Sequence, residues 1–264
     1  MSRKSTGHDI RKERDVHGAA WGNFHGGYFA DPSVAKPLLF NVCEAVRASH
    51  PEVVVDLGGG TGYLLSALRE HCPDLSAQLV NIDLSGKQLD KSAHDCIRTV
   101  QCAMETFTRT RIHARADKFL FLMRSALHYM GKHGIRPFLH HLRTQMANGE
   151  FFIHQTACFE RERDAECLNM LYTYMGTEKW YPQTDDLRTL LEQSGWSVLS
   201  VEPAPLLSLK SDDLAKRYGM KEGKVREICS VITREFSETD NVFRKTPGGF
   251  CAYLHYQIFT CVAV

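Results

Sequence analysis

Short apolar runs alternate along this chain with longer segments in which apolar residues recur at helical spacing. Residues 52–57 read Glu-Val-Val-Val-Asp-Leu, a nearly continuous β-branched run between turn residues, which predicts a parallel strand buried on both faces. Residues 63–70 then place apolar side chains at helical spacing, and residues 78–83 form a second apolar run. The three segments predict a βαβ unit.

The alternation continues along most of the chain. It begins with a helix that is capped by Asp31, has Pro32 at its first position and is expected to run to about Ser49. The remaining strands are expected at 98–102, 118–123, 150–156, 196–202 and 250–264, and the remaining helices at 85–95, 135–146 and 184–194. The pattern predicts an α/β fold, with a Rossmann-like, seven-stranded, mostly parallel sheet, helices on both faces and an antiparallel last strand.

Three segments lie outside this alternation. Residues 1–30 are polar and aperiodic at first, then mix aromatic residues with glycine between 21 and 29. Residues 158–182 predict an extra helix that is followed by aromatic residues. Residues 211–236 are rich in charged residues and in residues that favour helices. We expect one domain over residues 31–264, with the two latter segments inserted as helices that form a lid together with the N-terminal segment.

A glycine-rich loop, Asp56-Leu57-Gly58-Gly59-Gly60-Thr61-Gly62, connects the first strand to the next helix. Glycine lets the backbone pass close to a ligand, although such spacing also fits a structural turn or another nucleotide. Asp56 would repel a pyrophosphate but suits an ammonium group. Asp83 ends the second strand, where its carboxylate can accept both hydroxyls of a ribose or cap the helix that follows. The two carboxylates favour an amino acid nucleoside over a dinucleotide.

These residues resemble a known family. Residues 54–62 are similar to the first motif of class I S-adenosylmethionine-dependent methyltransferases, and residues 81–84 (Asn-Ile-Asp-Leu) are similar to the second. The resemblance extends more weakly from about residue 31 to the C-terminus, and it implies that 249–260 is a long antiparallel edge strand. The cofactor contacts that it implies are, for the methionine part, Asp56, Gly58, Gly59, Gly60 and Gly62; for the ribose, Asp83; and for the adenine, Leu84, Met104 and Glu105.

The adenine end departs from the family pattern. Many members carry Gly-Asp near the end of the third strand, whereas residues 101–105 of this chain read Gln-Cys-Ala-Met-Glu. Ala103 therefore lacks the usual carboxylate. The backbone amide of Met104 or the side chain of Glu105 is the expected substitute.

Catalytic candidates follow the predicted fourth strand. Residues 121–129 resemble a segment of small-molecule O-methyltransferases in which a histidine at the place of His128 can act as general base. The alternative is a histidine that only forms a hydrogen bond in a common turn. Arg124 is placed to contact the methionine carboxylate or an anionic substrate, and a solvated or ion-paired arginine is its alternative.

Aromatic residues are frequent in the segments expected to form the lid. Tyr28, Tyr172 and Trp180 are the candidate acceptor contacts, because aromatic walls suit a flat, apolar or cationic acceptor. Plain core packing explains the same residues. The further aromatic residues of these segments are Trp21, Phe24, Tyr174 and Tyr181. Histidine spacing shows no metal triad, so we expect no metal.

Composition narrows the class of protein. The chain has 264 residues, of which 43% are hydrophobic and 24% charged, and its net charge of +1 includes no basic block, so a nucleic acid partner is not expected. No apolar stretch is long enough to span a membrane and the N-terminus has no signal-peptide core, which predicts a cytoplasmic protein. The nine cysteines form no Cys-x-x-Cys pair and are expected as reduced thiols. A homodimer is compatible with the sequence.

The sequence thus predicts transfer of a methyl group from S-adenosylmethionine to an oxygen, nitrogen or carbon of a small-molecule acceptor. An RNA or protein methyltransferase is one alternative, although the Asp/Asn-Pro-Pro-aromatic motif of base-nitrogen enzymes is replaced by Arg-Ser-Ala-Leu at 124–127. A non-catalytic cofactor-binding subunit is another, because Ala103 lacks the carboxylate. A nicotinamide oxidoreductase is least favoured, since the chain lacks a Tyr-x-x-x-Lys pair.

Overall fold

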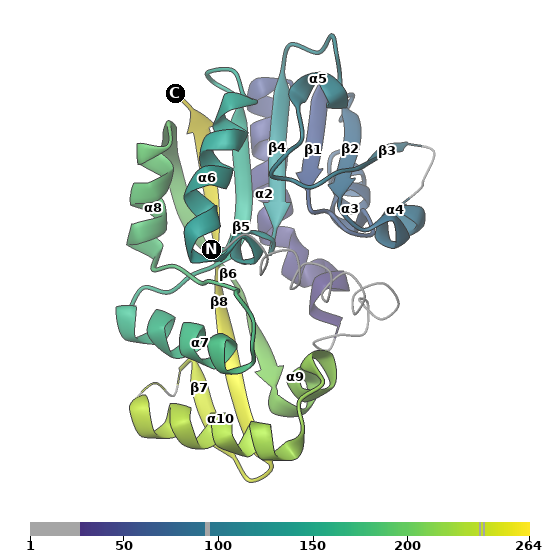
Figure 1. Ribbon diagram of the computed structural model, residues 1–264. Coiled ribbons are helices and arrows are strands. Elements are labelled where there is room, and N and C mark those ends of the chain that lie inside the picture. Colours follow the sequence, from purple (N-terminus) through teal and green to yellow (C-terminus); the bar gives the residue numbers. More distant parts are fainter. Residues whose placement is uncertain (1–26, 93–95, 238, 240) are drawn as a thin grey trace.

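A mixed eight-stranded sheet forms the centre of the molecule. The computed structural model describes residues 27–92, 96–237, 239 and 241–264, and within them the strand order is β3-β2-β1-β4-β5-β8-β6, with β7 beside β8 (Figure 1). The strands are β1 (Val53–Leu57), β2 (Gln78–Asp83), β3 (Ile97–Gln101), β4 (Phe119–Arg124), β5 (Phe151–Ala157), β6 (Trp196–Lys210), β7 (Phe243–Thr246) and β8 (Gly249–Ala263). The pairs among β1 to β5 are parallel, whereas β8 runs antiparallel to β5, β6 and β7. The predicted Rossmann-like α/β fold is confirmed.

Helices cover both faces of the sheet. The described helices are α2 (Pro32–Ser49), α3 (Tyr63–His71), α4 (Gly86–Ser92), α5 (Arg109–Ile112), the 3-10 turn η2 (Leu127–Met130), α6 (Gly131–Thr144), α7 (Glu162–Tyr174), α8 (Thr184–Gln193), α9 (Ser211–Tyr218) and α10 (Glu222–Glu235). Successive side chains of a strand point to opposite faces, so Val54 packs in the core formed with α2 and α3, whereas Val53 and Val55 pack in the core formed with α6 and α8. This two-sided burial explains the continuous apolar run of β1.

The first described helix shows how local sequence sets an element boundary. The Asp31 carboxylate accepts a hydrogen bond of 2.8 Å from the Ser33 N–H, and Pro32 occupies the first helical position. The helix ends at Ser49, and the C-cap residue His50 has a left-handed φ of 48°. Both ends fall where the sequence predicts them.

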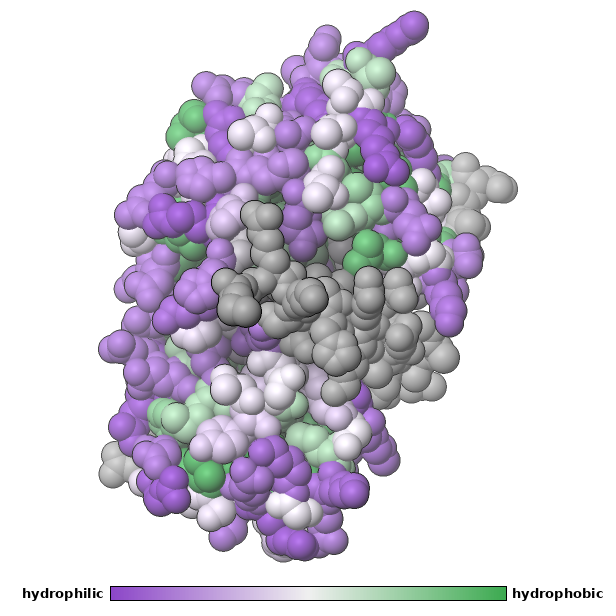
Figure 2. All heavy atoms as spheres, viewed as in Figure 1, coloured by the Kyte–Doolittle hydropathy of each residue, from purple (hydrophilic) through white to green (hydrophobic). Residues whose placement is uncertain are grey.

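The long strands β6 and β8 carry a second group of elements at their far ends. Their outer halves pair with each other and, together with β7, α7, α9 and α10, enclose an apolar core of their own. We call this group the lower lobe, because Figure 1 shows it below the rest of the sheet, on the side to which the arrowheads of β1 and β4 point. The segments 158–182 and 211–236 supply α7, α9 and α10. The face in Figure 2 is mostly hydrophilic, with small apolar patches on both parts.

Two expectations about the strands are corrected. The last strand is antiparallel, as predicted, but it lies between β5 and β6 instead of at the edge. The edge is formed by β6, which continues to Lys210 rather than ending at residue 202, because Pro203 and Pro205 are tolerated in an edge strand. The short strand β7, which the sequence pattern did not predict, makes eight strands among the described residues.

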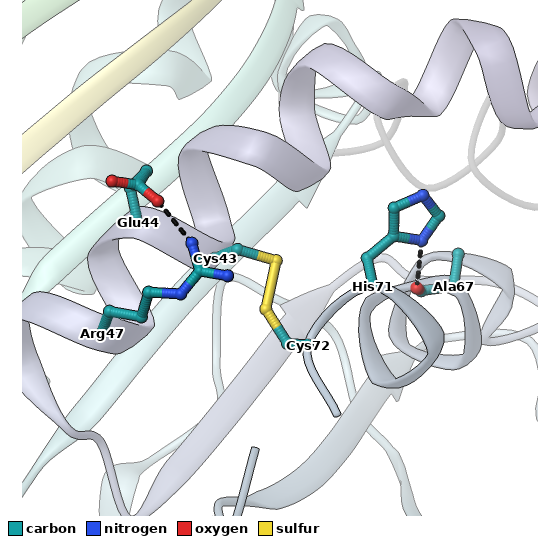
Figure 3. Close-up of a disulfide and its surroundings, with 6 residues drawn as sticks. All are labelled: Cys43, Glu44, Arg47, Ala67, His71 and Cys72. Carbon is teal, nitrogen blue, oxygen red and sulfur yellow. Dashed lines mark hydrogen bonds and ion pairs between the residues drawn. A yellow bond between two sulfur atoms is a disulfide. The ribbon is translucent and has the colours of Figure 1, made fainter. Parts of the chain in front are cut away.

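One pair of cysteines also differs from the expectation of reduced thiols. Cys43 in α2 and Cys72 directly after α3 form a disulfide (Figure 3). The two helices pack beside each other on the same face of the sheet, which brings the Cα atoms to 6.2 Å, within disulfide reach. The other seven cysteines are free thiols, as predicted.

Candidate active site

A cavity lies at the carboxyl ends of β1, β2 and β4. Its walls come from the β1–α3 loop, the end of β2, the turn after β3 and the segment after β4. Ligands of open parallel sheets bind at this edge. Nine of the ten predicted cofactor residues line the cavity: Asp56, Gly58, Gly59, Gly60, Asp83, Leu84, Met104, Glu105 and Arg124. The tenth, Gly62, is the N-cap of α3 and faces Ser92 of α4 instead.

Two glycines of the loop, Gly58 and Gly59, have little or no room for a side chain. Gly58 has a φ of 71°, and a Cβ added there would lie 3.3 Å from Cβ of Ala126, in the segment after β4. A Cβ on Gly59 would lie 2.4 Å from Oδ1 of Asn81 and 2.5 Å from Oδ2 of Asp56. The glycines therefore let the loop lie against β2 and against the post-β4 segment, which forms a narrow cradle.

Asp83 connects the end of β2 to the glycine loop. Its Oδ2 accepts a hydrogen bond from the Gly60 N–H at 3.0 Å, and its Oδ1 accepts one from the Ser85 N–H at 2.7 Å. Burial raises the pKa of this carboxyl, while the two N–H donors act in the opposite direction. Both oxygens keep a second lone pair for a ligand hydroxyl. The cap interaction and a ribose contact are therefore compatible.

Asp56 is the least satisfied polar group of the site. It is 1% exposed, and neither carboxylate oxygen has a hydrogen-bond partner among the described residues. Burial raises its pKa to about 8, and the nearby Asp83 carboxylate adds to this effect while Arg124 opposes it. A buried carboxylate without a partner is costly, so the position suits a ligand that brings a cation or a hydrogen-bond donor.

Arg124 supplies the opposite charge at the end of β4. Its Nη1 donates to the Phe29 carbonyl oxygen at 3.1 Å, and its guanidinium lies 5.5 Å from the ring centroid of Phe29 and 5.9 Å from that of Tyr28. Its Nε and Nη2 atoms have no partner among the described residues. Burial lowers the pKa of this guanidinium. Two donors in a fixed plane fit a carboxylate.

The turn after β3 forms the opposite end of the cavity. All four residues from 102 to 105 line it, and the Met104 methyl group would lie 3.7 Å from a Cβ at Gly58. Ala103 shapes the turn through its carbonyl oxygen, which accepts from the Thr106 N–H at 3.1 Å. Leu84, which is 38% exposed, lies beside the same cavity. This arrangement provides an apolar slot with backbone groups at its rim.

His128 lies behind the cavity wall. It is buried in η2, and its ring stacks against Tyr181 at a centroid distance of 5.2 Å and lies tilted against Tyr129 at 4.3 Å. Tyr129 lines the cavity, whereas His128 is not among the lining residues.

The three predicted acceptor residues also lie outside the lining of this cavity. Tyr28 is buried, with its ring 5.8 Å from that of Tyr256, and Tyr172 packs in the lower lobe 4.9 Å from Tyr181. Trp180 is partly buried beneath the ammonium of Lys132. Trp21 and Phe24 fall outside the described residues, and Tyr174 and Tyr181 belong to the lower lobe's packing.

Several lining residues were missed by sequence reasoning. Phe29, Tyr63 and Tyr129 supply the aromatic walls, and Ser125 lies at the end of β4 with a left-handed φ of 56°. The Ser125 hydroxyl shares a hydrogen bond of 2.6 Å with the Tyr256 hydroxyl. Tyr129 is adjacent to the predicted residue His128, which could have indicated it. For Tyr63 the sequence shows only that it begins a helix, and nothing in the pattern indicates a place in the cavity wall.

This fold and this site define a Rossmann-like, S-adenosylmethionine-dependent methyltransferase. A family model described as a methyltransferase domain matches residues 33–201, and the chain belongs to that family, which confirms the prediction from the glycine loop. The match ends before α9, α10 and the far half of β6. No curated protein sequence matches the chain.

Solved structures share the fold at low sequence identity. A putative methyltransferase from Bacillus halodurans is 16% identical with a TM-score of 0.61, over 83% of this chain and 96% of that one. The 1,6-didemethyltoxoflavin-N1-methyltransferase from Burkholderia thailandensis is 14% identical with a TM-score of 0.56, over 100% of this chain and 92% of that one. The mitomycin 7-O-methyltransferase MmcR is 14% identical with a TM-score of 0.58, over 99% of this chain and 61% of that one.

The described residues hold no group of three or more metal-ligating side chains. None of the described helices has the length and apolar content needed to cross a membrane.

Proposed function

We propose that this chain transfers the methyl group of S-adenosylmethionine to a small-molecule acceptor bound at the carboxyl edge of the sheet. The observation that carries the proposal is that the buried carboxyl of Asp56 and the buried guanidinium of Arg124 share the cavity wall, and that both have polar atoms without a partner among the described residues. The methionine part of the cofactor has an ammonium and a carboxylate. Asp56 in its ionised form can pair with that ammonium, and Arg124 can pair with that carboxylate.

The lining of the cavity supports a proposal for the other cofactor contacts. We assign the ribose hydroxyls to Asp83, whose carboxylate the loop already holds through Gly60. The adenine is assigned to the turn at 102–105, with Leu84 against its ring and the Met104 amide or Glu105 in place of the missing carboxylate. The loop from Gly58 to Gly60 supplies close backbone contact.

The bound cofactor supplies an electrophilic methyl group on a sulfonium. The chain's own residues position the acceptor near that methyl group and keep water away, which are the main contributions a protein makes to such a displacement. Phe29, Tyr63 and Tyr129 form walls suited to an apolar, flat acceptor. The acceptor proton must leave, and His128, in contact with Tyr129, is the proposed base.

The role of His128 is tested by turnover. A His128→Ala variant is expected to lose a hundredfold or more of kcat, on the order of the usual contribution of a general base, while its affinity for S-adenosylhomocysteine is retained. A variant with near wild-type turnover would leave His128 as a packing residue. The matched control is His133→Ala, because His133 is an exposed histidine in the next helix.

A small acceptor is favoured over a macromolecule by two observations. Two structural neighbours are named for methylation of small molecules, 1,6-didemethyltoxoflavin and mitomycin. The net charge of +1 gives the chain no overall attraction to the phosphate backbone of a nucleic acid. Oxygen, nitrogen and carbon acceptors all fit the proposal.

Calorimetric titration with S-adenosylmethionine and S-adenosylhomocysteine tests the cofactor site. We expect saturable binding by the wild-type protein and its loss in Asp56→Asn and Asp83→Asn variants. Binding that is absent in the wild-type protein would overturn the proposal. Incubation with deuterium-labelled cofactor and a panel of small acceptors, followed by mass spectrometry, then tests methyl transfer.

We also propose a cytoplasmic location and a homodimer, which rest on composition alone. Cell fractionation and light scattering of the purified chain test them.

A further inference from the structure

A pair of hydroxyl groups lies at the edge of the cavity, directly after β4. The Ser125 and Tyr256 hydroxyls are 2.6 Å apart and share one hydrogen bond. Ser125 lines the cavity, whereas Tyr256, in β8, is 2% exposed and is not among the lining residues. Ser125 also has a left-handed φ of 56°, a strained backbone conformation of the kind that clusters at ligand-binding sites.

The two hydroxyls carry two hydrogens but make only one hydrogen bond with each other. Among the described residues, neither hydroxyl has a second hydrogen-bond partner. If Ser125 donated to Tyr256, the hydrogen of the buried Tyr256 hydroxyl would have no acceptor there, which costs free energy. Burial raises the pKa of Tyr256, so this hydroxyl stays protonated and able to donate. Tyr256 is therefore the donor, and the Ser125 hydrogen remains available to a ligand in the cavity.

The Ser125 hydroxyl belongs to the same corner of the site as the Arg124 guanidinium. The Tyr256 ring stacks against the Tyr28 ring at a centroid distance of 5.8 Å, and the guanidinium lies 5.9 Å from the Tyr28 ring centroid. Both Arg124 and Ser125 line the cavity, and Nε and Nη2 of Arg124 have no partner among the described residues. The guanidinium and the hydroxyl therefore supply three unused hydrogen-bond donors at one corner.

Three donors beside one positive charge fit a carboxylate. Its two oxygens offer about four lone-pair sites, of which the two Arg124 N–H groups use two. We propose that Ser125 donates a hydrogen bond to the carboxylate of the cofactor, beside Arg124, and that Tyr256 is a positioning residue that orients the Ser125 hydroxyl. The inference rests on the proposed function, because it adds a contact to the cofactor bound in that cavity. It also gives β8 a part in the site, because the pairing of Tyr256 with Ala157 sets the tyrosine at the end of β5, next to β4.

Calorimetric titration with two ligands tests the contact. S-adenosylhomocysteine carries the carboxylate, and decarboxylated S-adenosylhomocysteine is the same molecule without it. A Ser125→Gly variant removes the hydroxyl, and glycine adopts the left-handed φ of this position without strain. We expect the variant to bind S-adenosylhomocysteine about tenfold more weakly than the wild-type protein does, and the decarboxylated ligand with wild-type affinity.

The matched control is His50→Gly. His50 has a similar left-handed φ of 48°, but it is the C-cap residue of α2 and is not among the lining residues, so both affinities should stay unchanged. Wild-type affinity of Ser125→Gly for S-adenosylhomocysteine, or equal losses for the two ligands, would overturn the inference. Absent binding of S-adenosylhomocysteine to the wild-type protein would instead reject the proposed function.

A second variant, Tyr256→Phe, tests the positioning role. It keeps the ring that stacks against Tyr28 and removes the hydroxyl that orients Ser125. The affinity for S-adenosylhomocysteine should fall about threefold, and the affinity for the decarboxylated ligand should not change. The Tyr256→Phe and Ser125→Gly double variant should bind S-adenosylhomocysteine no more weakly than Ser125→Gly alone, because Tyr256 acts through Ser125. Losses that add in the double variant would show that Tyr256 acts independently and would overturn its assigned role.

Discussion

The buried carboxyl of Asp56 makes a quantitative prediction about the protein without ligand. Its pKa is raised from 3.8 to about 8 in the folded chain, mainly by burial. The folded state therefore holds a proton that the unfolded chain releases, and stability falls as the pH rises from the unfolded pKa through the folded one. Each pKa unit corresponds to about 1.4 kcal/mol, so the loss between about pH 6 and about pH 8 is roughly 2 kcal/mol.

Replacing Asp56 with Asn removes the charge and nearly keeps the shape. The pH profile of the melting temperature is measured for both proteins, and the variant's profile is subtracted from that of the wild type to remove the effect of all other groups. The remaining fall in melting temperature over that pH range is expected to be about 5 °C. The Asp56→Asn profile should be flatter, and the variant should be the more stable protein at the upper end of the range. The measurement is thermal unfolding followed by circular dichroism in the absence of cofactor.

The control is Asp74→Asn, which neutralises an exposed carboxylate and should leave the pH profile unchanged. If Asp56→Asn loses stability with pH as steeply as the wild-type protein, then Asp56 is already ionised or partnered in the apo protein. If the variant also binds S-adenosylmethionine with wild-type affinity, the assignment of the ammonium to Asp56 is wrong.

Three further predictions concern the loop, the arginine and the disulfide. Gly58→Ala should destabilise the chain by about 1 to 2 kcal/mol and abolish cofactor binding, whereas Gly149→Ala, at a φ of 87° with no atom within 4 Å of the new Cβ, should affect stability alone in urea unfolding. Arg124→Gln should weaken S-adenosylhomocysteine at least tenfold and leave adenosine unchanged in calorimetry, because adenosine has no carboxylate; equal losses would place Arg124 elsewhere. Cys43→Ser should lower the free energy of unfolding by about 3 kcal/mol, and a reductant added to the wild-type protein should cause the same loss. A wild-type stability that does not change on reduction would show that the bond to Cys72 does not form in solution.

The sequence predicts those features that depend on neighbours along the chain. The β-branched run at 53–57, the cap at Asp31 and the glycine loop each have a local pattern, and each appears in the structure where it was expected. The carboxyl ends of parallel strands meet at one edge, so Asp56 and Asp83 could be expected to lie together. They do, although neither alone identifies its ligand.

Features that depend on distant pairing could not be predicted in this way. The position of β8 between β5 and β6 depends on which strands pair across the sheet, and the length of β6 depends on its pairing with β8 as far as Lys210. The disulfide depends on the packing of α2 against α3. Likewise, the hydroxyls of Ser125 and Tyr256 meet only after β8 has paired with β5.

The two carboxylates of the site differ in a way that has a consequence for function. Asp83 accepts hydrogen bonds from Gly60 and Ser85, so the loop fixes its orientation before any ligand arrives. Asp56 receives none from the described residues, so the folded protein without ligand keeps this carboxyl protonated below about pH 8, and a cationic ligand would stabilise its ionised form. Below about pH 8, Asp56 must release a proton before it can pair with the ammonium, and the free energy of that deprotonation reduces the net binding free energy. Cofactor affinity should depend on pH through Asp56, whereas Asp83 should set the geometry in which the nucleoside is held.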